Sequence, residues 1–289
     1  GGLFLIDLAT ASVLHALQVH TIAVQSVIFD GDEIISGSQD KTIRVWDKMS
    51  GRETLRIDAG AWVYSVAAHE NLLVAGLKDN TVRVFDRASG GPRHVLTEAT
   101  GEVNAVAIDA QRMVSGSDDK KVRVYAVPSF QLVRVLEGHT DWVRSVALEG
   151  DRIVSGSDDN TVRLWDARSG DALHVLQGHS QTVRSVSLLG SEIVSGSWDK
   201  SVRIWDAETG ASTRVLLGTE AVRPIEDVLG GPAPTAAAKE ALQAALANGD
   251  PAELGRCKLM VVGQGAAGKT STVRSLLGMA PVAEHLSTV

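Results

Sequence analysis

Runs in which apolar and polar residues alternate recur along most of this chain. Within residues 161–166, Val162 and Leu164 flank the polar Arg163, and the turn residues Ser-Gly-Ser and Asp-Asn stand just before them. Alternation with period two, bounded by turn residues, predicts a strand, a turn and a second strand. We therefore expect one unit of the pattern to hold four short strands, at residues 142–148, 152–155, 161–166 and 172–176.

The stretch 153–166 belongs to a repeat, with close copies at residues 34–47, 73–86, 113–126 and 193–206. The aromatic residue near the end of each copy advances by 39, 40, 40 and 40 residues, from Trp46 through Phe85, Tyr125 and Trp165 to Trp205. A fixed period near 40 is typical of a propeller blade or of a HEAT-type helix pair. The alternating pattern favours the blade, so the sequence predicts an all-β propeller.

The unit resembles a WD40 repeat, because Gly-His, Ser-Gly-Ser-x-Asp and Trp-Asp follow one another in that family's order. The resemblance implies a buried hydrogen-bond relay in each blade, formed by a His before the first strand, a Ser on the second, an Asp in the next turn and a Trp on the third. Three blades carry the whole set: His20, Ser36, Asp40 and Trp46; His139, Ser155, Asp159 and Trp165; His179, Ser195, Asp199 and Trp205. Because a catalytic triad occurs once, in a cleft, this periodic set is expected to be architectural.

Two blades depart from the relay. The matching residues are Ala59, Ala75, Asp79 and Phe85 in one blade and Ala99, Ser115, Asp119 and Tyr125 in the other. Both blades lack the His, so we expect them to be less stable locally.

An incomplete unit precedes the five full repeats. Counting 40 residues back from Trp46 reaches Ile6, so residues 3–7 and 12–17 are predicted as the last two strands of an earlier blade. Its first two strands are expected upstream of Gly1. Residues 221–227 repeat a Val-Arg-x-Ile pattern and are a candidate for one more first strand. A ring closed by that segment would have six blades, whereas missing upstream residues would give seven or more, which we favour because no second strand is found for a shared blade.

Propellers of this family are mostly rigid binding platforms, and three tryptophans lie outside the relay. Trp62 and Trp142 open first strands, and Trp198 comes just before a relay Asp. The resemblance implies that these positions, with the residue two beyond each opening, look out from one face. The residues expected to bind a protein partner are Trp62, Tyr64, Trp142, Arg144, Arg184 and Trp198. Trp, Tyr and Arg dominate interface hot spots, although packing between blades is the alternative.

The third strands also carry a repeated arginine. These residues are Arg44, Arg83, Arg123, Arg163 and Arg203. Because each occupies the same place in its blade, we expect a solvated strand face rather than a binding site.

Composition limits the remaining function classes. The chain has 289 residues, 44% hydrophobic and 22% charged, as expected for a globular protein. Its net charge of −7 argues against a surface that binds nucleic acids in general. The one cysteine, Cys257, excludes internal disulfides and Cys-based zinc sites and predicts a reducing, cytoplasmic setting. No apolar run has the length of a membrane span.

The composition changes at residue 230, where Gly-Gly-Pro-Ala-Pro breaks the repeat. Residues 236–248 predict a helix capped by Thr235. We therefore expect a propeller over residues 1–228, a linker with that helix over 229–255, and the first unit of an α/β P-loop domain over 256–289. In the last part, Gly263, Gly268, Lys269 and Thr270 satisfy G-x-x-x-x-G-K-[ST] between a predicted strand at 258–262 and a predicted helix at 271–277.

This motif predicts phosphate binding, because glycine N–H groups surround the phosphates, the lysine reaches the β and γ oxygens, and the threonine hydroxyl binds Mg²⁺. The residues predicted to hold the nucleotide are Gly263, Gln264, Gly265, Ala266, Ala267, Gly268, Lys269, Thr270 and Ser271. The region resembles Ras-like GTPases, most closely the Roc domains of Roco-type proteins. The resemblance implies that Thr288 joins Thr270 on Mg²⁺ and that the nucleotide is GTP, with ATP as the alternative.

The expected function is a protein-interaction scaffold whose propeller recruits partners under the control of a nucleotide switch in a longer parent. The alternative is a signalling NTPase whose main activity is hydrolysis, with the propeller as sensor or repressor. The resemblance places the later GTPase motifs beyond Val289, so no catalysis is expected from these residues alone.

Overall fold

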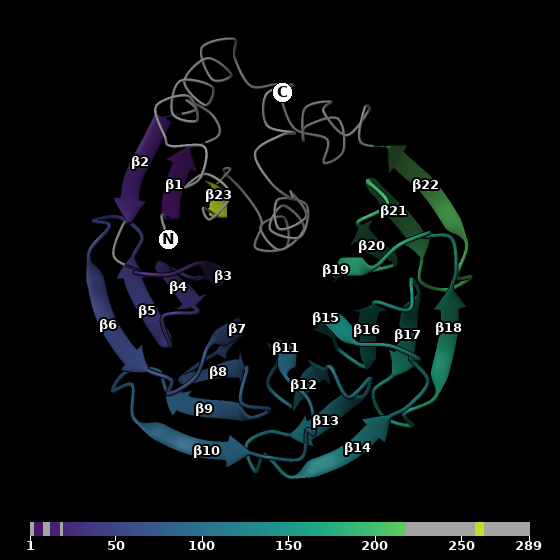
Figure 1. Cartoon of the computed structure of the whole chain (residues 1–289), viewed down its shortest axis with the longest axis horizontal. Coiled ribbons are helices and arrows are strands. Elements are labelled where there is room, and N and C mark those ends of the chain that lie inside the picture. The colour runs from purple at the N-terminus through teal and green to yellow at the C-terminus, as the bar shows by residue number, and fades with distance from the viewer. Residues whose placement is uncertain (1–2, 8–11, 18–19, 218–257, 263–289) are drawn as a thin grey trace.

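Within the residues that it describes (3–7, 12–17, 20–217 and 258–262), the structure, a computed structural model, consists of β-strands joined by turns. Most of these strands form five four-stranded antiparallel sheets, arranged as blades around a common centre (Figure 1), and the first strand of each blade lines a central channel. Each blade is a meander in which the strand nearest the channel comes first and the outermost strand comes last. The predicted all-β propeller built of blades is therefore confirmed.

The five blades have nearly the same strand lengths. Blade 1 holds β3 (Val24–Asp30), β4 (Glu33–Ser38), β5 (Thr42–Asp47) and β6 (Glu53–Asp58); blade 2 holds β7 (Val63–His69), β8 (Leu72–Leu77), β9 (Val82–Asp86) and β10 (Pro92–Leu96); blade 3 holds β11 (Val103–Ile108), β12 (Arg112–Ser117), β13 (Val122–Ala126) and β14 (Leu132–Leu136); blade 4 holds β15 (Val143–Glu149), β16 (Arg152–Ser157), β17 (Val162–Asp166) and β18 (Ala172–Leu176); blade 5 holds β19 (Val183–Leu189), β20 (Glu192–Ser197), β21 (Ser201–Asp206) and β22 (Ser212–Leu217). The strands expected from alternation in blade 4 agree with β15 to β18 to within two residues at each end.

Neighbouring blades pack face to face, which explains the glycine of the Ser-Gly-Ser motif. A Cβ on Gly156 of blade 4 would lie 2.7 Å from Cγ1 of Val183 in blade 5. Val183 is itself fully buried, so the glycine allows a close approach of the two sheets. Near the channel, the backbone N–H of Val186 donates to Ser145 Oγ of the preceding blade at 3.1 Å. The repeat thus encodes contacts between blades as well as the strands within them.

The incomplete unit predicted at the start of the chain is present. β1 (Leu3–Asp7) and β2 (Ser12–Leu17) pair in antiparallel order beside blade 1, and Leu3 and Leu5 are buried in a cluster with Trp46. The other edge of β1 pairs in parallel with β23 (Lys258–Val262), where a full blade would carry an antiparallel second strand. An open edge leaves backbone donors and acceptors unpaired, and β23 satisfies those of β1.

β23 coincides with the strand predicted to lead into the phosphate loop. The loop itself, Thr288, the candidate strand at 221–227 and the predicted linker helix at 236–248 lie outside the described residues. The division of the chain into three parts, the P-loop unit and its Mg²⁺ and nucleotide contacts therefore stay predictions.

Candidate functional site

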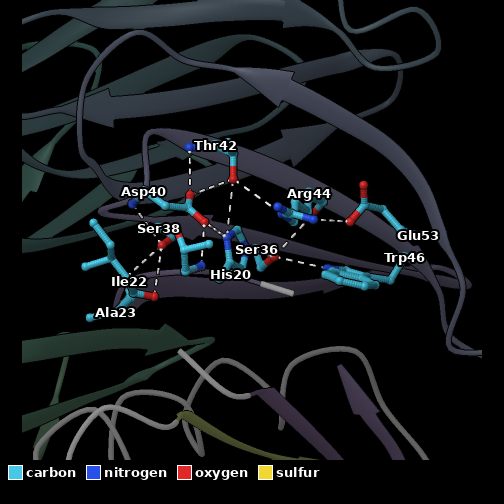
Figure 2. A network of polar contacts seen from close by, with 11 residues as sticks. His20, Ile22, Ala23, Ser36, Ser38, Asp40, Thr42, Arg44, Trp46 and Glu53 are labelled. Atoms are coloured by element: carbon cyan, nitrogen blue, oxygen red, sulfur yellow. Dashed lines mark hydrogen bonds and ion pairs between the residues drawn. The ribbon is translucent and has the colours of Figure 1, made fainter. Parts of the chain in front are cut away.

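The predicted relay forms in blade 1 as a continuous chain of hydrogen bonds (Figure 2). Trp46 Nε1 donates to Ser36 Oγ at 3.0 Å, and Ser36 Oγ lies 2.8 Å from His20 Nε2. His20 Nδ1 then meets Asp40 Oδ2 at 2.8 Å. With the Nδ1 proton donated to the carboxylate and the Ser36 hydroxyl donated to Nε2, every buried polar atom along this chain is paired and the imidazole is neutral.

Blades 4 and 5 repeat this geometry. The His–Asp and His–Ser distances are 2.8 Å in both, from His139 and His179. Trp165 and Trp205 each donate to the local serine at 2.8 Å. The same buried constellation therefore occurs three times with the bonds that the resemblance implied, and none of its residues lines the channel.

Burial and hydrogen bonding shift the titration of the relay. Burial lowers the pKa of His20 and His179 below 6.5, although the neighbouring aspartates oppose the shift. Burial alone would raise the pKa of Asp40 and Asp199, but bonds from Thr42 and His20, and from Ser201 and His179, outweigh it and lower both to about 2. The folded state therefore holds a neutral imidazole beside a carboxylate.

Acidification from neutral pH toward pH 5 is expected to lower the free energy of unfolding. Because the pKa of His20 and His179 is depressed by folding, the unfolded chain binds more protons over this range, so stability is lost as pH falls. The depressed pKa of Asp40 and Asp199 adds a second loss as pH falls from about 4 to about 2. Urea midpoints measured across this pH range report the effect. In His179→Gln the midpoint should fall less between neutral pH and pH 5 than in the original chain. An equal fall in that variant would contradict the assignment of this loss to the histidines.

In the two blades without the His, an arginine pairs with the relay aspartate instead. Arg83 Nη2 lies 2.7 Å from Asp79 in blade 2, and Arg123 donates to both oxygens of Asp119 in blade 3 at 3.0 and 2.7 Å. Blade 2 retains no further relay member, since Ala75 and Phe85 have no polar side-chain group. In blade 3, Tyr125 still donates to a carboxylate, that of Glu98, at 3.3 Å.

The prediction that the third-strand arginines form a solvated face is wrong for Arg44 and Arg123. Arg44 and Arg123 are only 4% exposed, and the guanidinium of Arg163 lies 5.7 Å from the centre of the Trp165 ring. Blades cover both faces of a third strand, so a polar residue there lies between two sheets rather than in water. Alternation within one strand does not reveal this second covering layer.

Unequal protection of the blades is expected in hydrogen exchange. Backbone amides of β8 and β9, in blade 2, should exchange faster than the matching amides of β16 and β17, in blade 4, because blade 2 lacks the relay that ties strands two and three together. Mass-spectrometric exchange on peptides from the two blades measures this difference. Equal protection factors would contradict the role given to the relay.

Three of the predicted partner-binding residues, Tyr64, Arg144 and Arg184, line the channel, which has a volume of about 740 Å³. In each blade the first strand pairs with the second so that Val183, for example, faces Ser197, and the next turn residue, Trp198, donates its N–H to the Thr182 carbonyl at 3.0 Å. The same bond recurs in all five blades. The opening of strand one and the turn after strand two therefore meet at the same end of every blade, which we call the rim.

A β-bulge in each first strand determines which residue faces the rim. The pairing of first and second strands skips one residue, and the skipped residues are Gln25, Tyr64, Asn104, Arg144 and Arg184. A bulged residue is released from the ladder and its side chain is re-aimed. All five line the channel, so the position that the resemblance marked for partner binding has a backbone cause.

The six residues predicted to bind a partner differ in how much of each side chain is exposed at the rim. Trp142 and Trp198 are 43% and 50% exposed, whereas Trp62 is half-buried and Lys78 Nζ lies 3.9 Å from the centre of its ring. Tyr64 donates to Glu102 of the next blade at 2.7 Å, and burial followed by this carboxylate raises the pKa of the phenol. The two exposed tryptophans, rather than all six residues, offer free aromatic surface.

Carboxylates at the rim hold Arg144 in place. Asp158 binds its Nε and Nη2 at 2.8 and 2.7 Å, and Asp118 lies 3.6 Å away. Asn104 bridges Asp118, at 2.7 Å, to the backbone of blade 4, and burial raises the pKa of Asp118. The sequence analysis missed Asp118 and Asp158, although each occupies the turn position at which Trp198 was singled out in blade 5.

Comparison with known proteins now decides the family. The model of the WD domain, G-beta repeat, matches residues 11–47, 90–126, 130–166 and 170–206, which together make just over half of the chain. The chain belongs to the WD40 repeat family. The family model does not match blade 2 separately, and this is the blade with the fewest relay residues.

Within the described strands and turns of this WD40 protein, no cluster of His, Cys, Asp and Glu could hold a metal ion, and no helix could span a membrane.

Three individual proteins are similar to parts of this chain. Mitochondrial division protein 1 of Kluyveromyces lactis is 44% identical over 45 residues, 16% of this chain and 6% of that protein. Among solved structures, the computationally designed Ika8 protein is 29% identical with a TM-score of 0.64, and the match covers 71% of this chain and 64% of that one. The structure of U3-55K is 24% identical with a TM-score of 0.66; the match covers 70% of this chain and 66% of that one and shows likeness of fold.

Proposed function

We propose that this WD40 protein is an interaction scaffold that binds protein segments at the rim, through Trp142, Trp198 and the bulged arginines. The observation that carries the proposal is the exposure of two tryptophans at one channel mouth, beside an ion-paired guanidinium that fixes the ring of Trp142. Arg144 Cζ lies 4.5 Å from the centre of that ring. Large aromatic surfaces held in one orientation lose little entropy on binding, which favours their use as anchors.

The alternative considered for these rings, packing between blades, applies to Trp46, Trp165 and Trp205, which are 2% exposed. Trp142 and Trp198 instead keep about half of their surface free, whereas the channel is lined by both serine and apolar side chains. This distribution supports recognition of an extended peptide lying over the rim.

Selection of random peptides displayed on phage against the 289-residue chain tests the proposal. Selected peptides should lose binding to Trp142→Ala and to Trp198→Ala. Val133→Ala, which truncates an exposed apolar residue on the outermost strand of blade 3, is the matched control. Failure to select any peptide, or peptides whose binding ignores both tryptophans, would count against the scaffold function.

A finer proposal rests on the motif at residues 263–271. In the native protein this segment would bind the phosphates of GTP through Lys269 and hold Mg²⁺ through Thr270 and Thr288, and the resulting switch would control recruitment by the propeller in the cytoplasm. The alternative is a signalling NTPase with ATP as its nucleotide. Photo-crosslinking of azido-GTP and azido-ATP to the tagged native protein from its source cells distinguishes these, and labelling that survives Lys269→Ala would contradict both.

A further inference from the structure

Among the described residues that line the channel, one cation has no carboxylate partner. Arg144 and Arg184 are the cationic side chains among the described residues that line the channel. Arg144 is ion-paired with Asp158. Arg184 has no ion pair or hydrogen bond to a described side chain, and its contact is with the ring of Trp198, 5.6 Å from Cζ to the ring centre. The two equivalent positions in adjacent blades thus differ in whether the positive charge is compensated.

The surroundings of Arg184 disfavour its own charge. Burial lowers the pKa of the guanidinium, and the positive charge of Arg144 lowers it further, while Asp158 and Asp118 oppose the shift from a distance. A desolvated guanidinium costs free energy unless an anion pairs with it. Its position on the bulge between Val183 and Ser185 directs the group to the channel mouth, where a ligand can reach it.

We propose that Arg184 binds the carboxylate side chain of an acidic peptide, with Trp198 and Trp142 packing against the flanking residues of that peptide. The proposal rests on the scaffold function proposed above and specifies its ligand. An Asp or Glu side chain supplies one negative charge and two acceptor oxygens, which match the planar donor fork of the guanidinium. The exposed ring of Trp198, which contacts Arg184, and that of Trp142 in the adjacent blade supply apolar contact to the peptide.

A carboxylate fits this place better than a phosphate. Asp118 and Asp158 occupy the neighbouring part of the rim, and burial has already raised the pKa of Asp118. A phosphoryl group brings close to two negative charges, one more than Arg184 can neutralise, and it would face these carboxylates at close range. A singly charged carboxylate adds less negative charge beside Asp118 and Asp158 than a phosphoryl group does.

The test uses peptides selected from the displayed random library on the full chain. Enrichment of Asp or Glu at one peptide position is expected. Replacing that residue by Gln or Asn in a synthetic peptide should weaken binding roughly ten- to one-hundred-fold, and Arg184→Gln should weaken the original peptide by a similar factor. Arg214→Gln, which removes an exposed arginine on β22, is the matched control and should leave affinity unchanged.

Two further variants make the outcome decisive. Arg184→Lys keeps the charge but loses the planar fork, so partial loss of affinity is expected even if Arg184→Gln fails to fold. Replacing the peptide's acidic residue by phosphoserine should not improve binding; tighter binding would overturn the carboxylate assignment. Peptides that depend on Trp142 and Trp198 but ignore Arg184 would overturn this inference and leave the scaffold function standing. Peptides that ignore the tryptophans as well would overturn both.

Discussion

Trp165→Ala should lower the free energy of unfolding by about 3–5 kcal/mol, the range expected for removing a large aromatic residue from a packed core. Trp165 is 2% exposed and packs in the cluster between blades 3 and 4. Its loss also removes the donor to Ser155 and the ring that meets His139 edge-on, with centroids 6.1 Å apart. Urea unfolding followed by far-ultraviolet circular dichroism measures the change.

Trp198→Ala is the matched control, because it deletes the same side chain at a rim position that is 50% exposed. Its unfolding free energy should stay within about 0.5 kcal/mol of the original chain. A small effect of Trp165→Ala, or an effect of Trp198→Ala of similar size, would contradict the division between relay and rim tryptophans.

Loss of either rim tryptophan should weaken binding of a selected peptide by about thirtyfold or more, the effect of a hot-spot residue worth about 2 kcal/mol. Trp142 is the stronger candidate, because Arg144 stacks on its ring while Asp158 fixes Arg144. The indole is therefore ordered before the partner arrives, and less entropy is lost on binding. Isothermal titration with the original chain and the two variants gives the affinities.

The affinity of the double variant, which lacks both rings, gives a second readout. If one peptide contacts both, the double variant should bind more weakly than either single variant, and the losses need not add because the residues share a ligand. Variants that remain folded and keep full affinity would contradict the assignment of the rim as the binding surface.

Sequence reasoning succeeded where the signal was periodic. Alternation and turn residues located the strands of blade 4 closely, and the step of 40 residues from Trp46 identified β1 before its partner strands were known. The relay was predicted residue by residue from the resemblance to WD40 repeats, and all three complete copies have the bonds that the resemblance implied. A local sequence pattern is sufficient to predict such features when every blade packs in the same way.

It failed where a residue's surroundings come from another blade. The third-strand arginines alternate with buried residues, yet Arg44 and Arg123 are buried because an adjacent sheet covers the strand. Similarly, the rim carboxylates Asp118 and Asp158 read as ordinary turn residues, and only the bulge that turns Arg144 toward them reveals an ion pair. No single-strand pattern contains this information.

The parallel pairing of β23 with β1 was also beyond sequence reasoning. The segment 258–262, predicted as a strand from its apolar run, forms β23. Which edge it would join depends on the open backbone of an incomplete sheet more than two hundred residues away in the chain. Short apolar strands carry little information about their neighbours.

The most direct test of rim binding is a two-dimensional ¹H–¹⁵N spectrum of the tryptophan indoles, recorded as a selected peptide is added. The chain has six tryptophans. Three donate their indole N–H within the relay and serve as internal controls. Binding at the rim predicts that the signals of Trp142 and Trp198 shift with the peptide while those of Trp46, Trp165 and Trp205 stay in place. Bound peptide with unchanged rim signals would place the binding surface elsewhere and contradict the proposal.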